Sequence, residues 1–492
     1  MSYLDLSIRE IHEALLNKKV SILDLTKEAI SRAKKDTNNA FECILEKEAL
    51  EKATKLNDTI IPKDNYFYGI PYVAKDNFST KDIETTGGSN ILVGYMPLFD
   101  ATVIKYLNEA GAILIGKTTL DELAMGGTGT SGHKGKTFNP YDPSHTHMIG
   151  GSSCGSAAAV ADGIVPFALG SDTGDSVRKP ASNSALVGMK PTWGLISRYG
   201  LFPFAPSLDH VAYFTRNVED SALLLNLLSK HDDNDETNSF KTRDDYFKEL
   251  NSNVKGKKIA VIKEIRESIT DKEMNKKFNE SLEFLKNEGA IVEEVSMNKD
   301  LLTSIFPTYF VISCAEATSN NANLDGIKFG PNYGGKTYQE VMYNVRTKGF
   351  SGLIKRRFVI GSYSLMSENQ HDLFLRAQKA RHLIVDAFNE VFKKYDCIYL
   401  LAAPNVAPKF DEASDRLNNE YLIADNYLAF GNFGGYPSMT IPLGFKNGLP
   451  YGANITSKPY DEKSVFNLAL NLEKFTHLAD VSFLNYKDKE EK

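Results

Sequence analysis

The chain has few cysteines, and their spacing excludes disulfide-rich and zinc-knuckle classes. The four cysteines among its 492 residues are Cys43, Cys154, Cys314 and Cys397. None belongs to a CxxC pair, whereas disulfide frameworks and zinc knuckles need closely spaced cysteines. The nine His include no HExxH pair, and the close pair His145 and His147 is more typical of a loop than of a metal site. The sequence therefore predicts no metal site.

Long apolar runs and a strong excess of one charge are also missing. No stretch approaches the 18 uncharged apolar residues of a transmembrane helix. The N-terminal residues MSYLDLSIREIHE lack the basic segment and apolar run of a signal peptide. The formal net charge of −6 is unfavourable for wrapping nucleic acid. We expect a cytoplasmic protein with no membrane association.

What remains is an ordinary globular composition, with 42% hydrophobic and 24% charged residues. Length alone favours two to four domains, although large α/β enzymes can have a single domain that is longer than usual. A chain of this size can bury most of its apolar surface without disulfides or a structural metal. Nothing in the composition indicates a fibrous, coiled-coil or disordered protein.

Residues 1–60 have the pattern of helices. Ser7-x-x-Glu10 and Ser21-x-x-Asp24 each precede an apolar-periodic run. This is the pattern of a helix N-cap with a carboxylate three residues later. We expect a helical arm that packs on the main domain, with packing on a partner chain as the alternative.

The rest of the chain predicts one α/β unit. Strand–helix–strand patterns occur at 69–74, 101–110 and 112–116, and again at 257–262, 271–287 and 290–295. This alternation is typical of a sheet with helices on its faces. We therefore predict an α/β domain over 61–486 and a solvated tail over 487–492. The polar segment 231–245 predicts an exposed loop.

Small residues are densest at 150–191, in two Gly/Ser turns. The turns are GGSSCGS at 150–156, which leads into an Ala-rich helix start, and GSDTGDS at 170–176. Backbone N–H groups at such positions can hold an anion or a developing oxyanion. Steric demand alone explains most lone Gly/Ser turns, and neither turn has the phosphate-binding pattern GxxxxGK[ST]. Two serine-containing turns flanking a short helix favour nucleophilic catalysis.

Lys75 is the candidate base, because no nearby His stands out. It directly follows the apolar residues IPYVA. Burial there would lower its pKa and leave a neutral amine as a proton acceptor. A salt bridge at the sheet edge is the alternative for a lone Lys. The combination with the two serine turns favours catalysis.

Three motifs together resemble the amidase signature family. They are GIPYVAKDNF (69–78), GGSSCGSAAAVADG (150–163) and LGSDTGDSVRKPAS (169–182), in the family's order and spacing. Further segments, at 194–220, 316–330 and 355–365, resemble one branch of it, the glutaminase subunits of tRNA-dependent amidotransferases. The resemblance implies an α/β fold in which a large mixed β-sheet is sandwiched between helices.

The resemblance also implies a Ser–cis-Ser–Lys triad. By this resemblance, Ser176 attacks the amide carbonyl, and Ser152 relays a proton to and from Lys75. The peptide bond between Gly151 and Ser152 is cis in the family. The oxyanion hole would consist of backbone N–H groups of Thr173, Gly174, Asp175 and Ser176. An acyl-enzyme forms, ammonia leaves, and water completes the hydrolysis.

In that branch the amide belongs to glutamine, whose two charges need one binding group of each sign. By resemblance, Arg356 or Arg357 binds the α-carboxylate and Asp425 binds the α-amino group. The family also places pocket-lining groups at Met125, Gly126 and Tyr309. Without the resemblance, Asp425 is an ordinary helix or loop acid and the Arg pair belongs to a solvated face.

The resemblance implies partners as well. Ammonia would pass to the B subunit of the amidotransferase, which uses ATP and Mg²⁺ to convert Glu-tRNA(Gln), and often Asp-tRNA(Asn), to the amidated form. A third protein, the C subunit, would complete a heterotrimer. This chain itself would need no cofactor and would reach tRNA mainly through the B subunit. A stand-alone amidase for small amides is the alternative, and a non-catalytic scaffold is a third possibility.

Two positions depart from the family, which usually has Gly where this chain has Cys154 and Asp175. Cys154 predicts only a buried small side chain. The carboxylate of Asp175 beside the nucleophile would oppose a developing oxyanion. We therefore expect an active enzyme in which Asp175 points outward, toward Arg178 or Lys179.

Overall fold

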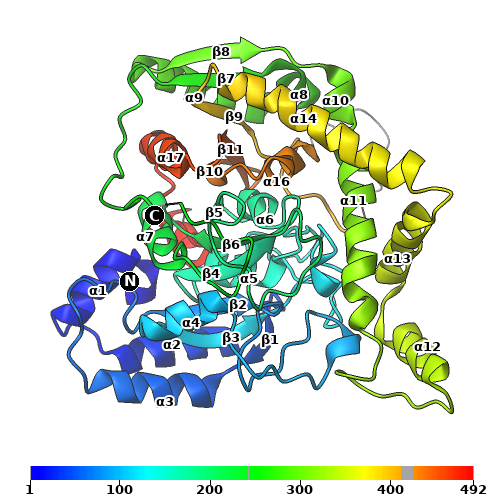
Figure 1. Ribbon diagram of the computed structural model, residues 1–492. Helices are drawn as coiled ribbons and strands as arrows, with labels where there is room; N and C mark the ends of the chain where they lie inside the picture. The colour runs from blue at the N-terminus through cyan, green and yellow to red at the C-terminus, as the bar shows by residue number, and fades with distance from the viewer. Residues whose placement is uncertain (1, 242, 412–424, 491–492) are drawn as a thin grey trace.

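One mixed β-sheet runs through the middle of the molecule (Figure 1). The computed structural model describes residues 2–241, 243–411 and 425–490, with the backbone only for 487–490. Within these residues the strand order is β1-β3-β2-β4-β6-β5-β10-β11-β9-β7-β8. The strands are β1 (Phe41–Ile44), β2 (Pro71–Lys75), β3 (Ile113–Thr118), β4 (Phe167–Asp172), β5 (Val187–Lys190), β6 (His210–Thr215), β7 (Lys258–Ile262), β8 (Ile291–Val295), β9 (Cys397–Leu401), β10 (Ser438–Lys446) and β11 (Leu449–Ser457).

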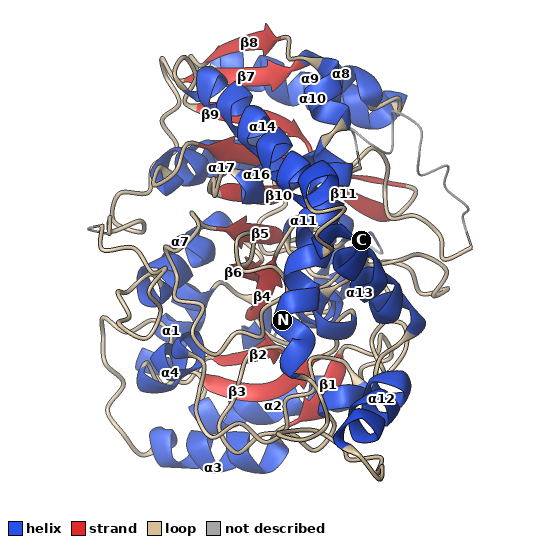
Figure 2. Ribbon diagram, turned by 45° about the vertical axis from the view of Figure 1, so that its right-hand side comes forward, coloured by secondary structure: helices blue, strands red, loops and turns tan. Residues whose placement is uncertain are grey.

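Helices cover both faces of this sheet, as the fold class predicted (Figure 2). Helices α4, α7 and α17 lie on one side, and α11 and α13 lie on the other. The α-helices are α1 (Ile8–Leu16), α2 (Ile22–Lys34), α3 (Glu46–Asn57), α4 (Thr102–Glu109), α5 (Cys154–Ala161), α6 (Arg178–Asn183), α7 (Val218–Leu228), α8 (Lys263–Ser268), α9 (Lys272–Asn287), α10 (Lys299–Thr303), α11 (Ile305–Asn320), α12 (Tyr338–Gly349), α13 (Gly352–Leu365), α14 (Arg376–Phe392), α16 (Phe430–Phe433), α17 (Glu462–Thr476) and α18 (Phe483–Glu490).

Strands β2 and β4 form the part of the sheet that matters most for function. They pair in parallel, with Ala74 opposite Leu169, so their carboxyl ends lie at the same edge. Every residue of both strands is buried, which matches the continuous apolar runs of a parallel sheet covered on both faces. Antiparallel pairing begins on the other side of β4, at β6.

The N-terminal segment packs on the rest of the chain. Helix α1 has the predicted capping box between Ser7 and Glu10. The guanidinium of Arg216 donates hydrogen bonds to the backbone oxygens of Leu4 (2.7 Å) and Leu6 (2.8 Å). Apolar side chains of α1 and α2 join the same buried cluster as those of β2 and β3. The first helices therefore share the core of the sheet.

One local prediction was wrong, and a second holds only in part. The first sixty residues are not all helical, because β1 pairs antiparallel with β3; its four residues, FECI, are too short to show a period. The segment 231–245 is not wholly exposed, because buried Asp232 accepts hydrogen bonds from Thr102 and Ser197. The predicted solvated tail overlaps the end of α18, which extends to Glu490, and residues 491–492 lie outside the described residues.

One helical stretch, Lys299–Asn323, is by length and composition apolar enough to cross a membrane. The 18-residue segment that has this composition is 44% buried within the protein. Its main helix, α11, packs against α13 and α14. A core helix of a globular protein has the same composition, so this stretch is weak evidence for a membrane span.

We predict that replacing Leu25 with Ala lowers stability strongly. Leu25 of α2 is 0% exposed, and truncating such a side chain costs about 2–5 kcal/mol through lost burial and the cavity left behind. The measurement is the midpoint of chemical denaturation. Leu383→Ala, at a site 56% exposed, is the matched control and should leave the midpoint nearly unchanged. Equal midpoints for the two variants would contradict a shared core.

Candidate active site

The predicted base lies where two strands and a helix meet. Lys75 is the last residue of β2, and Ser171 lies near the end of the neighbouring strand β4. The serine turn at Ser152 and Ser153 comes directly before α5. All four side chains are buried, with Lys75, Ser152 and Ser153 each 0% exposed. The register of β2 and β4 brings the amine to Ser171, and the turn before α5 adds the hydroxyls of Ser152 and Ser153.

The Lys75 amine contacts three serine hydroxyls. Its Nζ lies 2.7 Å from the Oγ of Ser152, 2.9 Å from that of Ser171 and 3.0 Å from that of Ser153. The peptide bond between Gly151 and Ser152 is cis, as the family resemblance implied. The structure thus brings the predicted base and relay into direct contact.

Burial determines the charge of Lys75. Desolvation lowers its pKa to about 7, although surrounding acidic groups favour the charged form. An exposed lysine is a cation at neutral pH, whereas burial favours the neutral amine of Lys75. A neutral amine has a lone pair that can accept a proton.

The Lys75 amine donates to all three serine hydroxyls. A neutral amine has two N–H groups and one lone pair. Ser153 donates its own hydroxyl proton to the backbone oxygen of Ser171 (3.1 Å), so its oxygen accepts from Lys75. The Ser171 hydroxyl accepts the other N–H, and Asn77 holds it from the far side at 2.9 Å. The amine also donates to the Ser152 Oγ at 2.7 Å, and the lone pair of the neutral amine can take the Ser152 proton when this pair exchanges donor and acceptor.

Ser176 lies next to this turn. Its backbone oxygen accepts a hydrogen bond from the N–H of Ser153 (3.3 Å), and its side chain is 4% exposed. Within the described residues the Ser176 hydroxyl has no hydrogen-bond partner. The link from Lys75 to Ser152 is therefore formed, while the link from Ser152 to Ser176 is not closed by a hydrogen bond in this structure.

The loop before Ser176 has donors available for an oxyanion. The backbone N–H groups of residues 173–176 make no hydrogen bond to any other described residue. The ring of Tyr309 packs closely on Gly174, because a Cβ at this position would lie 2.9 Å from the ring. Available N–H groups beneath an aromatic ring can bind the oxygen of a tetrahedral intermediate.

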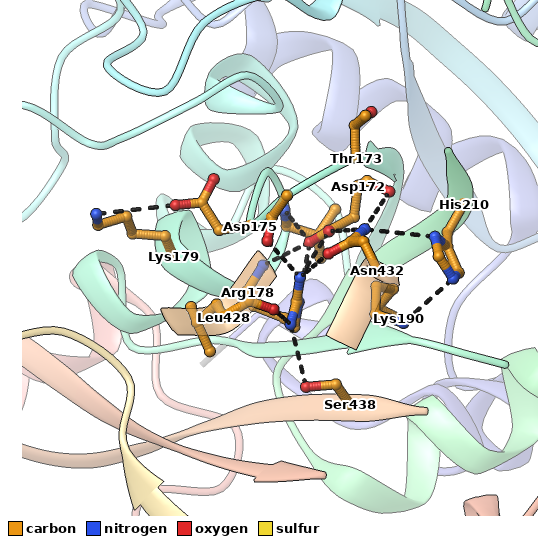
Figure 3. Close-up of polar contacts among 12 residues, drawn as sticks. Asp172, Thr173, Asp175, Arg178, Lys179, Lys190, His210, Leu428, Asn432 and Ser438 are labelled. Atoms are coloured by element: carbon orange, nitrogen blue, oxygen red, sulfur yellow. Dashed lines mark hydrogen bonds and ion pairs between the residues drawn. The ribbon is translucent and has the colours of Figure 1, made fainter. Parts of the chain in front are cut away.

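A buried ion pair holds this loop in place (Figure 3). Arg178 and Asp172 are each 0% exposed and lie 2.9 Å apart. Arg178 also donates to the backbone oxygen of Gly174 and to the side chain of Asn432, each at 2.7 Å. Burial opposes the ionisation of Asp172, but the charge and hydrogen bonds of Arg178 outweigh it and hold the pKa well below its usual value. These buried charges fix the backbone that carries the oxyanion donors.

Asp175 points away from this ion pair, toward Lys179 (Figure 3). Its carboxylate lies 3.8 Å from the Lys179 amine, whereas Arg178 pairs with Asp172. Burial raises the pKa of Asp175 to about 6, partly opposed by the charge of Lys179. The expected outward orientation is confirmed, with Lys179 as the partner.

Asp121 is a site residue that the sequence did not reveal. Its carboxylate accepts backbone N–H groups from all four residues of 128–131. A Cβ at Gly151 would lie 1.9 Å from the same carboxylate, and one at Gly126 would lie 2.4 Å from its carbon. Asp121 therefore fixes the Gly-rich loop beside the cis peptide. Met125, which precedes Gly126, is fully buried.

The structure separates the two candidate arginines. Arg356 is exposed, whereas Arg357 is partly buried and lies over the rings of Phe204 and Phe310. The charge of Arg357 also acts on the pKa of the Tyr309 phenol, so it lies near the predicted pocket. No carboxylate pairs with Arg357 among the described residues, and its buried Nε has no hydrogen-bond partner there. Arg357 is thus the candidate for a substrate carboxylate.

The structure also places the other residues that the sequence analysis named. Asp425 accepts a hydrogen bond from Lys179 at 2.5 Å. Cys154 is a buried small side chain, as expected, and burial raises its pKa to about 12. His147 binds Asp142 in a loop at 2.8 Å. Among the described residues, no group of three or more His, Cys, Asp or Glu side chains could hold a metal ion.

Comparisons with known proteins agree with this site. A family model described as Amidase matches residues 24–466. The A subunit of glutamyl-tRNA(Gln) amidotransferase from Staphylococcus epidermidis is 39% identical over 486 residues, covering 96% of this chain and 98% of that protein. The crystal structure of the corresponding protein from Thermotoga maritima has a TM-score of 0.77 and 35% identity, covering 96% of this chain and 95% of the other.

We predict that Ser176 labelling by a fluorophosphonate probe follows the protonation of Lys75. The labelling rate should rise about tenfold per pH unit below a midpoint near 7 and level off above it, because only the neutral amine accepts a proton.

Ser153→Ala removes one acceptor of a Lys75 N–H. It should slow labelling about tenfold and move the midpoint to lower pH, since the ammonium loses more stabilisation than the neutral amine.

The matched control is Ser156→Ala. Ser156 is equally buried, but its hydroxyl binds Thr118 and the backbone oxygen of Leu169 instead of Lys75. It should keep the wild-type midpoint. A Ser153→Ala profile that matches the Ser156→Ala profile would contradict the proton arrangement described above.

Proposed function

Since this chain belongs to the amidase family, we propose that it hydrolyses the side-chain amide of glutamine and supplies the ammonia to an amidotransferase that acts on Glu-tRNA(Gln). Ser176 is the nucleophile, Ser152 the proton relay and Lys75 the base. The observation that carries the proposal is the buried Lys75 amine, with its pKa near 7, 2.7 Å from Ser152.

The reaction begins when Ser176 Oγ bonds to the amide carbon. Its proton passes to Ser152, whose own proton passes to Lys75. The carbonyl oxygen becomes an oxyanion that the N–H groups of residues 173–176 bind. The C–N bond then breaks as the proton returns through Ser152 to the nitrogen, which leaves as ammonia. Water attacks the acyl-enzyme with the same base, releasing glutamate and restoring Ser176.

Arg357 and Asp425 would hold the two charged ends of glutamine. A half-buried guanidinium without a carboxylate partner among the described residues favours an anionic ligand. Asp425 lies on the Ser176 side of the site, tied through Lys179 to the loop of Asp175. A simple aliphatic amide needs neither group, so this pair favours glutamine over the stand-alone amidase alternative.

The partners follow from the relatives, each of which is the A subunit of an amidotransferase. This chain would assemble with the B and C subunits of such an enzyme, and the B subunit would use ATP and Mg²⁺ and contact most of the tRNA. This chain would need no cofactor for hydrolysis. Its net charge of −6 is compatible with leaving the nucleic acid to a partner.

The test is a glutamine hydrolysis assay with and without the B and C subunits of a related amidotransferase. The proposal predicts glutaminase activity that rises when these partners are added and disappears in Ser176→Ala. Hydrolysis of small amides but not of glutamine would identify a stand-alone amidase. Failure of the fluorophosphonate probe to label Ser176 would identify a non-catalytic scaffold.

We predict that the two neighbouring arginines respond differently to the same substitution. Arg357→Met should lower kcat/KM for glutamine about tenfold to a hundredfold, mainly through KM, because a charged hydrogen bond contributes about 1.5–3 kcal/mol. Arg356→Met removes an exposed guanidinium and should have little effect. The measurement is kcat/KM for glutamine from the steady-state kinetics of both variants. A larger loss in Arg356→Met would reverse the assignment.

A further inference from the structure

A buried asparagine joins Lys75 at the Ser171 hydroxyl. The amide nitrogen of Asn77 donates to the Oγ of Ser171 at 2.9 Å, and the Lys75 amine donates to the same oxygen, also at 2.9 Å. Asn77 is 1% exposed and Ser171 is 3% exposed. Asp76, which lies between Lys75 and Asn77 in the chain, instead contacts Lys117 at 3.0 Å. Asn77 therefore reaches the base through one hydroxyl and not through its neighbour in the chain.

Two groups at this contact have no hydrogen-bond partner among the described residues. The first is the amide oxygen of Asn77, Oδ1, which is buried and accepts no hydrogen bond. The second is the O–H group of Ser171, because both lone pairs of this hydroxyl are used by Lys75 and Asn77 and no hydrogen bond leads from its proton. A half-turn of the Asn77 amide exchanges Oδ1 with Nδ2 and places an acceptor within hydrogen-bond distance of that O–H group.

No contact among the described residues fixes the Asn77 amide in one orientation. Because its Oδ1 has no partner there, either end of the amide can face Ser171. Asn432, which is also buried, shows the contrast, since its Oδ1 accepts from Arg178 and its Nδ2 donates to Asp172. Turning the Asn432 amide would break both contacts, whereas turning the Asn77 amide exchanges one hydrogen bond with Ser171 for another.

The two orientations suit the two protonation states of Lys75. When Oδ1 faces Ser171, the hydroxyl donates to Asn77 and accepts from Lys75, and this chain of hydrogen bonds stabilises the ammonium form. When Nδ2 faces Ser171, the hydroxyl proton is free to point at the lone pair of the neutral amine. An ionised aspartate can only accept, and leucine can do neither. Asparagine is the side chain of this shape that serves both forms of the base.

We propose that Asn77 is a positioning residue that holds Lys75 through Ser171 in both of its proton states, by turning its amide as the proton arrives and leaves. The inference rests on the proposed function only in taking Lys75 as the base, so it applies to glutamine and to any other amide. Each half-reaction delivers a proton to Lys75 and takes it back. A partner that suited one state alone would slow one of these two transfers.

The other groups that act on the charge of Lys75 lie outside this chain of contacts. The acidic groups that raise its pKa are Cys154, Asp121, Asp172 and Asp209. Among the described residues, none of them is within hydrogen-bond distance of the Lys75 amine, which contacts serine hydroxyls. They are the same in every variant below, so their effects cancel when variants at position 77 are compared.

The test is the pH profile of Ser176 labelling by the fluorophosphonate probe, measured on the full chain. Each profile gives a midpoint and a labelling rate at high pH. Asn77→Asp supplies an acceptor of the same shape, and Asn77→Leu removes both hydrogen-bonding ends. Ser171→Ala, alone and combined with Asn77→Leu, shows whether Asn77 acts through that hydroxyl.

We expect the two substitutions of Asn77 to change different quantities. Asn77→Asp should raise the midpoint by about one pH unit or more, because the carboxylate favours the ammonium. Its high-pH rate should stay within about threefold of the wild type, since Ser171 is still held. Asn77→Leu should keep the midpoint within about 0.3 pH unit and lower the high-pH rate about tenfold, because both proton states lose the same support. In Ser171→Ala, adding Asn77→Leu should change neither quantity further.

Asn238→Leu is the matched control. Asn238 is similarly buried, at 2% exposed, but its amide contacts the backbone of Gly194 and Asp232. It should keep the midpoint and the high-pH rate of the wild type. Asn77→Ala gives the same comparison with a smaller side chain in case Asn77→Leu folds poorly.

The outcomes separate this inference from the proposed function. A midpoint that moves by about one pH unit in Asn77→Leu shows that Asn77 favours one proton state, and overturns the inference. An equal loss of rate from Asn77→Leu with and without the Ser171 hydroxyl overturns it as well. So does a rate that falls alike in Asn77→Asp and Asn77→Leu with neither midpoint moved, because the role is then only structural. A wild-type chain that the probe does not label at Ser176 overturns the proposed function, and the inference with it.

Discussion

The site depends on the burial of one amine. Lys75 is fully buried and has no carboxylate within hydrogen-bond distance among the described residues, so desolvation dominates its pKa and brings it to about 7. The neighbouring ion pair of Lys117 and Asp76 shows the contrast, because Lys117 is just as buried but has a carboxylate at 3.0 Å. Of these two lysines on adjacent strands, Lys117 contacts a carboxylate and Lys75 contacts hydroxyls.

Much of the fold and the position of Lys75 could be predicted from the sequence, because the signals there are local. The run IPYVA before Lys75 predicted a buried strand that ends in a charge, and β2 ends at Lys75. The choice of Arg357 over Arg356 also had a local signal: Arg357 lies three residues after buried Ile354 and four before buried Gly361 on α13. That periodicity is present in the sequence and indicates a partly buried side chain at Arg357.

Other parts of the site could not be predicted, because they depend on contacts between distant segments. Ser153 and Ser171 orient Lys75 from a turn and a strand, and a serine in a Gly-rich turn carries no signal of its own. Asp121 gains its role from a loop that folds around its carboxylate. The pairing of Lys179 with Asp425 spans 246 positions. These interactions appear only when the sheet brings the segments together.

The parallel pairing of β2 and β4 has a consequence for control. Strand register places Lys75 beside Ser171 in the buried interior, and the turn before α5 adds Ser152 and Ser153, so the base and the hydroxyls are in contact without a substrate. Activation therefore requires no movement between domains to complete the base. A signal that silences the enzyme has to act elsewhere, on the loop of Ser176 or on access of the amide to it. The contact that is open in this structure is the one between Ser152 and Ser176, at the loop and not at the base.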